Sequence, residues 1–507
     1  MALLKSLLKD TALYGLPSIV GRFLNYLLVI LQTQVMPATS GEYGVVTNLY
    51  AYTALILVFL TFGMETTFFR FANKQEEDPM KVYSTALITV GGLSIGFLAL
   101  VLAFLQPLAD ALGYPDHPEF LAVMALIVSI DSFACIPFGY LRYQKKAKKF
   151  ALLKIVNILV NIGLNLFVFL LCPLIYRSHP EWIGWFYDSE YLAGYVFMIN
   201  LVTSVVTLIM LMKEWMPGGQ FHASDGTVCK FRYVWDAPLF SRMFRYSYPV
   251  LILGIAGILN QTLDKIIYPH LVPGHEGEVQ LGIYGACVKI AMIMAMFTQA
   301  FRFAYEPIIF NKSKDKRDVV QTNALGMKYF IIVSLLGFLC VMAWIDVLKV
   351  WIIRDPNYWV GLQVVPIVMA AEIMMGIYFN LSFWYKLIDQ TLWGALFSVV
   401  GCLVLVAVNV VFVPQYGYMA CAWAGLCGYG TCMLLSYFVG QKKNPIPYDL
   451  KSVGSYALLA VALFVSMTQV PEAGIWTIII KTAHVLFFFA FMCWKDFPVW
   501  KMLKKKM

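Results

Sequence analysis

Apolar stretches of about 20 residues recur along the whole chain, and this recurrence limits the possible folds more than any other feature. A helix of that length crosses the hydrocarbon core of a bilayer. Backbone polar groups in hydrocarbon must be paired within the protein, so such spans form helices. The composition agrees, because 60% of the residues are hydrophobic and only 13% are charged, against about 25% charged in soluble domains. The sequence predicts an all-α polytopic membrane protein.

Fourteen transmembrane helices are expected, and the loops between them differ in charge. Lysine and arginine gather in "LRYQKKAKKF", in "NKSKDKR", at 442–443 and in the tail "KMLKKKM", whereas the alternate loops hold only Arg177, Lys349 and Arg354. By the positive-inside rule the basic loops and both termini are cytoplasmic. The net charge of +9 then follows from topology and does not indicate nucleic-acid binding. The expected spans are 11–36, 45–70, 83–107, 119–140, 151–174, 191–213, 247–268, 282–309, 324–346, 361–386, 391–414, 418–439, 453–470 and 475–493.

Two halves of the chain resemble each other. One opens with "LYGLPSIVGRFLN" and the other with "RYSYPVLILGIAGILN", and the next span begins with "GEYG" in the first half and "GIYG" in the second. Two six-helix bundles with the same orientation are expected, related by a pseudo-two-fold axis along the membrane normal. The expected division is a bundle at 1–213, a cytoplasmic linker at 214–246, a bundle at 247–439, and an appended helix pair with a basic cytoplasmic tail at 440–507. The linker suits either an interfacial helix or a solvated connection.

Several kinds of chemistry have no motif in this chain. GxxxxGK[ST], the phosphate-binding loop of ATP-driven pumps, does not occur. The ten cysteines contain no CxxC pair, so they do not indicate zinc or a disulfide framework. We therefore expect no cofactor and no metal, and transport work must be driven by an ion gradient or a partner.

One helix face in the fifth span is polar. Lys154, Asn157, Asn161 and Asn165 recur at intervals of three or four residues, which places them on the same side of a helix. They must face either a hydrated cavity or a partner helix, because amides and an ammonium group do not face lipid together. Lys154 adds a charge that packing does not need, although near the start of the span it can also reach the inner interface.

Other spans also carry ionisable groups. They include Arg22 with Asn25 in the first span, Glu65 at the end of the second, Lys289 in the eighth, and Asp264 with Lys265 in "ILNQTLDKIIYP". Adjacent residues lie about 100° apart around a helix, so we expect Asp264 and Lys265 not to neutralise each other. Candidate counter-charges for Asp264 are Lys289, Arg22 and Lys154.

Four segments together resemble one transporter family. They are "LPSIVGRFLNYLLVILQTQVMPATSGEYGVV", "FGMETTFFRFANK", "LNQTLDKIIYPHLV…LGIYGACVKIA" and "VNVVFVPQYGYMACAWAGLCGYG". Their order and spacing are similar to those of the polysaccharide-transporter (O-antigen and exopolysaccharide flippase) family of the multidrug/oligosaccharidyl-lipid/polysaccharide exporter superfamily. The resemblance implies two bundles around a cationic, hydrated chamber. It also implies translocation of a polyprenyl-diphosphate-linked oligosaccharide, the precursor of lipopolysaccharide, O-antigen, capsule or exopolysaccharide, from the inner to the outer leaflet.

The resemblance assigns roles to the polar residues of the spans. Cationic groups would replace the hydration of the diphosphate and amides would satisfy sugar hydroxyls, so the expected substrate-binding residues are Arg22, Asn25, Lys154, Asn157, Asn161, Asn165 and Lys289. Asp264, Lys265 and Glu65 would supply ion coupling or chamber charge. The implied setting is the bacterial inner membrane, with a proton or sodium gradient and a polysaccharide polymerase as candidate partners.

Three alternatives remain open from the sequence. A lipid II flippase shares the fourteen-span plan and a cationic chamber. A multidrug/cation antiporter of the same superfamily would have a more acidic chamber and twelve spans. An integral-membrane glycosyltransferase would need clustered carboxylates in a sizeable extramembrane loop, and the cytoplasmic loops here are short or basic. We therefore expect a transporter and not an enzyme.

Overall fold

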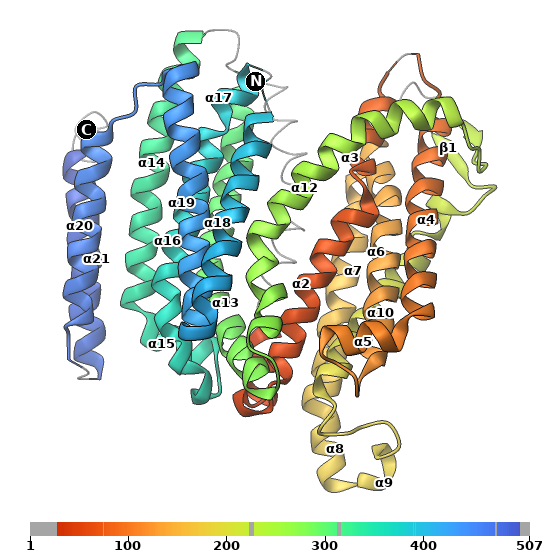
Figure 1. Ribbon diagram of the computed structural model, residues 1–507, viewed down its shortest axis with the longest axis horizontal. Helices are drawn as coiled ribbons and strands as arrows, with labels where there is room; N and C mark the ends of the chain where they lie inside the picture. Colours follow the sequence, from red (N-terminus) through yellow and green to blue (C-terminus); the bar gives the residue numbers. More distant parts are fainter. Residues whose placement is uncertain are drawn as a thin grey trace, which may run out of the picture. The chain divides into compact units, whose positions relative to one another are not determined.

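The structure is a computed structural model that describes residues 28–74, 76–222, 228–311, 316–388, 390, 392–471 and 474–496 and is nearly all helical (Figure 1). Thirteen helices in this part of the chain are long and apolar enough to cross a membrane. They match the second to the fourteenth expected spans one by one. Most of the first expected span lies outside the described residues, and 28–35 is helical. The predicted fold class, an all-α polytopic membrane protein, is confirmed.

The chain packs as two compact units, Met1–Gly282 and Ile283–Met507. The boundary falls inside the helix 275–311. The preceding helix, 237–271, packs against the helix 42–61 and so belongs to the N-terminal unit. The expected division at 213 and 247 rests on the internal repeat and stays a prediction. The N-terminal unit contains η1 (Ala38–Ser40), α2 (Glu42–Thr61), α3 (Met64–Ala72), α4 (Pro79–Ala103), α5 (Leu105–Leu112), α6 (Pro118–Tyr143), α7 (Ala147–Leu166), the π-helical turn η2 (Phe167–Leu171), α8 (Cys172–Ser178), α9 (Pro180–Ile183), α10 (Leu192–Met210), α11 (Met212–Trp215), β1 (Gln220–His222), β2 (Val228–Lys230), α12 (Ala237–Leu271) and the start of α13 (His275–Asn311).

The C-terminal unit continues α13 and adds the remaining helices. Proline begins the 3-10 turn η3, where the missing proline N–H costs no hydrogen bond. The elements that follow α13 are α14 (Lys316–Ala343), α15 (Ile345–Ile352), η3 (Pro356–Gln363), α16 (Val364–Leu381), α17 (Phe383–Leu387), α18 (Leu392–Tyr416), α19 (Tyr418–Lys443), α20 (Leu450–Thr468) and α21 (Ile475–Lys495).

The "GEYG" motif allows two helix starts to approach closely. A Cβ atom on Gly44 would lie 1.9 Å from the carbonyl oxygen of Glu278, and a Cβ on Gly282 would lie 3.0 Å from the backbone nitrogen of Gly44. Any larger residue at Gly44 would therefore separate α2 from the first turns of α13. Gly41, which precedes α2, has φ of 74°, a left-handed conformation that glycine adopts without steric cost.

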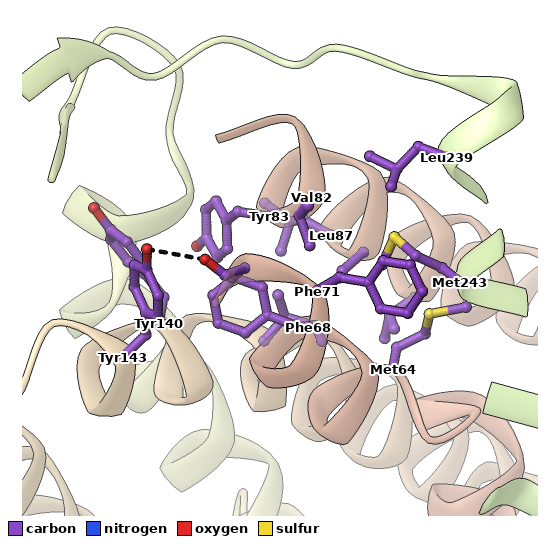
Figure 2. Close-up of a cluster of buried hydrophobic side chains, with 14 of the residues drawn as sticks. Met64, Phe68, Phe71, Val82, Tyr83, Leu87, Tyr140, Tyr143, Leu239 and Met243 are labelled. Atoms are coloured by element: carbon purple, nitrogen blue, oxygen red, sulfur yellow. Dashed lines mark hydrogen bonds between the residues drawn. The ribbon is translucent and has the colours of Figure 1, made fainter. Parts of the chain in front are cut away.

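A cluster of buried aromatic and apolar side chains holds one end of the N-terminal unit together (Figure 2). Phe68 on α3 packs edge-on against Tyr83 on α4 and Tyr143 on α6, with ring centroids 5.6 Å apart in both pairs. The Tyr143 hydroxyl donates a hydrogen bond to the carbonyl of Ala72 at 3.3 Å. Leu239 and Met243 bring the start of α12 into the same cluster, so α12 is anchored to this bundle.

The segment expected as a linker, 214–246, is ordered where the structure describes it. It contains the end of α11, an antiparallel hairpin in which Phe221 pairs with Cys229, and the first ten residues of α12. The Asp236 side chain caps α12 by accepting a hydrogen bond from the Leu239 N–H at 2.9 Å. The helix then continues without a break to Leu271. An interfacial position for its first turns stays a prediction.

Ion pairs attach the C-terminal helix pair α20–α21 to the rest of its unit at both ends. At one end, Asp346 on α15 accepts hydrogen bonds from Lys349 and from Lys481 on α21, each at 2.8 Å. Burial alone would raise the pKa of Asp346, but these two lysines outweigh it and hold the pKa below its usual value.

At the other end, Lys328 on α14 contacts Asp449 at 3.0 Å and Asp496 at 2.6 Å. The Tyr456 hydroxyl also donates to Asp496, at 2.7 Å. The hydrogen bond from Lys328 lowers the pKa of Asp449. Burial opposes the same effect at Asp496, yet the bonds from Lys328 and Tyr456 lower the pKa of that carboxyl too. Both aspartates are thus stabilised in the charged form.

Candidate functional site

The polar face of α7 contacts α10 inside the N-terminal unit. The Asn157 amide donates to the hydroxyl of Thr207 at 2.8 Å, and the Asn161 amide donates to the side-chain oxygen of Asn200 at 3.1 Å. Asn165 donates back to the backbone carbonyl and the side-chain oxygen of Asn161, at 2.8 and 3.2 Å. The bonds of Asn157 and Asn161 are interhelical contacts of the kind that the sequence left open as the alternative to a cavity lining, whereas those of Asn165 stay within α7.

The four residues of this face differ in exposure. Asn161 and Asn165 are buried, at 6% and 1%, whereas Lys154 and Asn157 are half-buried. Asn200 continues the polar contacts to a third helix, because its amide donates to the hydroxyl of Tyr50 on α2. The deeper amides therefore join α7, α10 and α2, and the other end of the face remains accessible.

Asp131 lies at the accessible end of this face. It occupies the middle of α6 and its side chain is exposed, although α6 is among the most buried spans. Its carboxylate lies near the Ser204 hydroxyl on α10 and interacts electrostatically with the Lys154 ammonium on α7. The Lys154 ammonium also lies 4.1 Å from the ring centroid of Phe138. An acid and a base from neighbouring helices thus share an accessible polar site within one bundle.

Sequence reasoning missed Asp131. The indication was present, since "LIVSIDSFAC" places a single carboxylate at the centre of an otherwise apolar span. A charged group at that depth is costly and usually functional. Asn200 and Tyr50 gave no comparable indication, because isolated amides and tyrosines are common in spans.

A second polar contact joins α2 to α12. The Asn48 side chain, which is 1% exposed, donates to the backbone carbonyl of Lys265 at 2.7 Å and accepts from the Tyr114 hydroxyl at 2.9 Å. Asp264 is also buried, at 7%. The "LNQTLDKIIYP" stretch therefore packs against α2, and Asn48 links it to the loop that carries Tyr114.

The expectation that Asp264 and Lys265 do not neutralise each other is wrong. The Lys265 ammonium lies 3.0 Å from both carboxylate oxygens of Asp264 and 3.2 Å from the carbonyl of Gln261. The long lysine stem reaches around the 100° that separates the two Cα–Cβ directions. A buried carboxylate is strongly destabilised without a cation. Pairing with Asp264 therefore stabilises the protein more than a lysine side chain directed away from it would.

The other predicted charges are placed as follows. Glu65 on α3 forms an ion pair with Arg142 at the end of α6, and Arg142 also lies 5.1 Å from the Phe69 ring centroid. Lys289 is half-buried on α13 in the C-terminal unit. Arg22 and Asn25 lie outside the described residues. No group of three or more metal-ligating side chains occurs among the residues that the structure places.

A match between this sequence and a protein-family model identifies the family of the chain. The model described as "Polysaccharide biosynthesis protein" matches residues 7–311, which is more than half of the chain. The chain belongs to this polysaccharide biosynthesis protein family. The resemblance drawn from the four sequence segments is thereby confirmed.

Solved structures with this fold are transporters. One titled "Lipid II flippase MurJ, inward closed conformation" superposes with a TM-score of 0.72 at 11% identity, covering 95% of this chain and 98% of its own. A multidrug resistance MATE family transporter of the MOP superfamily, in an inward-facing conformation, gives 0.61 at 13% identity, covering 85% and 97%. The MATE multidrug transporter DinF-BH gives 0.58 at 14%, covering 86% and 96%. No curated protein sequence matches the chain. This member of the polysaccharide biosynthesis family therefore has the fold of MOP-superfamily transporters.

Proposed function

We propose that this protein is a flippase that moves a polyprenyl-diphosphate-linked oligosaccharide from the inner to the outer leaflet of the bacterial inner membrane by alternating access. The observation that carries the proposal is the family match over residues 7–311 on a transporter fold. Lipopolysaccharide, O-antigen, capsule and exopolysaccharide precursors are the cargo class. Both termini are cytoplasmic in this proposal, a polymerase receives the product, and the protein catalyses no covalent step.

Lys154 and Asp131 give the proposal a physical mechanism. A diphosphate leaves water only if cations replace its hydration, and Lys154 is a half-buried cation on an accessible polar face. The Asp131 carboxylate interacts electrostatically with that cation. A diphosphate that engages Lys154 competes with Asp131, and the carboxylate then takes up a proton or a sodium ion. Cargo binding and ion uptake are thereby coupled through one lysine.

The remaining polar residues divide by exposure. Asn157, half-buried beside Lys154, is proposed to contact cargo sugars together with Arg22, Asn25 and Lys289. Asn161 is buried and is proposed to hold α7 against α10 through its hydrogen bond to Asn200, while the buried Asn165 donates back to Asn161 within α7. The Asp264–Lys265 and Glu65–Arg142 pairs are proposed as charges that keep the chamber electrically balanced.

Depletion of the protein in intact cells tests the cargo. Spheroplasts with the protein should expose lipid-linked glycan to an impermeant glycosidase, and depleted spheroplasts should keep the glycan protected until they are lysed. The same cells should export a rhodamine dye at an unchanged rate. If depletion blocks dye efflux and leaves glycan exposure intact, the multidrug alternative replaces this proposal. If only the peptidoglycan precursor becomes protected, the lipid II alternative does.

Replacement of Asp131 by asparagine tests the coupling. Asp131→Asn keeps an acceptor oxygen near the Ser204 hydroxyl but removes the charge. Translocation by this variant should no longer depend on the external pH or sodium concentration. Translocation that still responds to the ion gradient as in the wild type would show that the coupling ion is bound elsewhere.

A further inference from the structure

The segment between α8 and α10 folds around a small core of its own. Cys172, Ile183 and Tyr187 form this core. The Tyr187 N–H donates to the carbonyl of Ile183 at 2.9 Å, and the Gly184 N–H donates to the carbonyl of Pro180 at 2.8 Å. The connection between these two helices is therefore a folded element that can present side chains in fixed positions.

Two tryptophans of this segment point outward, and we call Trp182 and Trp185 the tryptophan pair. They are 65% and 83% exposed. The His179 ring stacks on Trp182 with centroids 4.5 Å apart, and the Trp185 indole N–H donates to the carbonyl of Trp182 at 3.2 Å. Both indoles are thus held in place while most of their surface faces outward. Rigid tryptophans in water are characteristic of binding surfaces.

The tryptophan pair lies past the hydrocarbon core of the bilayer. In the continuous helix Ala147–Ser178, exposed leucines extend from Leu152 to Leu174, a rise of about 33 Å. That length matches the hydrocarbon core of about 30 Å, so Leu174 marks one boundary of the core. Arg177 follows it, and α8 and α9 project beyond α5 and α6 of the same unit (Figure 1). The tryptophan pair therefore comes after the headgroup region begins, on the side opposite to the basic loop 142–149.

The charges near the tryptophan pair suit a carbohydrate better than a lipid surface. Glu181, Asp188 and Glu190 are exposed, and the segment 174–191 contains only one basic residue besides histidine, Arg177. Such an acidic surface is repelled by anionic headgroups. Carboxylates accept hydrogen bonds from hydroxyl groups, and the negative face of an indole suits the C–H face of a sugar ring.

We propose that Trp182 and Trp185 bind the oligosaccharide of the cargo on the outer side of the membrane. This inference rests on the proposed function, which supplies both the glycan and the orientation. The indoles pack against sugar rings, and Glu181 and Glu190 accept hydrogen bonds from sugar hydroxyls. Binding of the glycan where it leaves the protein favours the outer leaflet over return of the cargo.

Glycan binding by the full-length protein tests the inference. The protein is held in phosphatidylcholine nanodiscs, and the probe is the water-soluble oligosaccharide that mild acid releases from the polyprenyl diphosphate glycan of the same cells. Saturation-transfer NMR measures the dissociation constant. Trp182→Ala and Trp185→Ala should each weaken binding by about fivefold or more, the loss of one aromatic contact. Trp185→Phe, which keeps an aromatic ring, should bind nearly as the wild type does.

Trp476→Ala is the matched control. Trp476 is also 65% exposed, but it lies in the first turn of the apolar helix α21, where an aromatic belt faces lipid. This variant should bind the oligosaccharide as the wild type does. Equal binding by all the tryptophan variants would overturn the proposal. A loss in Trp185→Phe as large as in Trp185→Ala would also overturn it, because the hydrogen bond to the Trp182 carbonyl would then explain the effect.

A depth measurement separates the glycan from a lipid surface as the ligand. Spin labels on Trp182→Cys and Trp476→Cys, in a background without native cysteines, report exposure to a water-soluble nickel reagent and to oxygen, which enters the bilayer. We expect nickel exposure at 182 and oxygen exposure at 476. Oxygen exposure at 182 would make the tryptophan pair a membrane anchor and overturn the proposal. Neither readout involves transport, so if they fail while depleted spheroplasts still protect the glycan, the proposed function stands without this inference.

Discussion

Replacement of Asn200 by leucine separates the structural amides from the cargo-binding ones. The Asn200 side chain bonds two other helices, through Asn161 on α7 at 3.1 Å and through the Tyr50 hydroxyl on α2. An interhelical hydrogen bond in a membrane contributes about 0.6 kcal/mol on average and about 1.7 kcal/mol at most. Losing two should lower the free energy of unfolding by about 1.2 kcal/mol, and by no more than about 3.4 kcal/mol.

Asn157→Leu is the matched comparison. Its amide makes one interhelical bond, to Thr207 at 2.8 Å, so the same scale gives a loss of about 0.6 kcal/mol. Asn157 is also half-buried beside Lys154, where we place the cargo. Asn200→Leu should therefore be the less stable variant but export normally per folded molecule, and Asn157→Leu should be the more stable variant but export poorly.

Both quantities can be measured on the same preparations. Unfolding is followed in mixed micelles with increasing dodecyl sulfate, and export is measured in cells and divided by the amount of folded protein in the membrane. If the two variants lose stability and export in the same proportion, the division of the polar face by exposure is incorrect. If Asn200→Leu abolishes export at unchanged stability, that amide acts on the cargo and not on helix packing.

Three other parts of the molecule give further predictions. Single cysteines at Lys146 and His275, in a background without native cysteines, should react with an impermeant reagent from opposite sides of the membrane; labelling of both from outside would refute the span count. Asp449 and Asp496 have lowered pKa values, so their stabilising effect is complete above the unfolded pKa of about 3.9 and is lost as the pH falls through the lower folded value. Lys328→Met should therefore make the melting temperature depend less on pH between pH 7 and pH 3. If the pH dependence is the same in the variant, the Lys328 network is not its cause. Asp264→Asn and Lys265→Gln should each destabilise the protein, while the double variant costs less than their sum; additive energies in a double-mutant cycle would remove the pairing.

Hydropathy made the spans predictable. Each of the thirteen described spans coincides with an expected one because hydrocarbon allows only helices of roughly fixed length. The hairpin of β1 and β2 was not predicted, since it lies outside the apolar pattern and is held by packing of Phe221 against Tyr83 and Tyr140. Long-range contacts of that kind leave no periodic trace in a sequence.

The polar sites were predictable only in part. Helical periodicity placed Lys154 and the three asparagines on one face, but it did not reveal that α10 supplies Asn200 and Thr207 as partners. Asp131 was not predicted as a site residue, because no second polar residue on α6 lies at helical spacing from it. The pairing of Asp264 with Lys265 shows that backbone direction alone does not decide where a long side chain places its charge.

Translocation by the purified protein tests the central claim most directly. Proteoliposomes that contain the protein receive a fluorescent polyprenyl-diphosphate oligosaccharide, lipid II or a rhodamine dye, and an impermeant quencher reports the rate at which each reaches the opposite face. The account predicts that the oligosaccharide is translocated faster than the other two. It also predicts that Lys154→Gln slows this translocation by about tenfold or more, the loss of a charge-assisted hydrogen bond to phosphate. Equal rates in protein-free liposomes, or wild-type rates with Lys154→Gln, would contradict it.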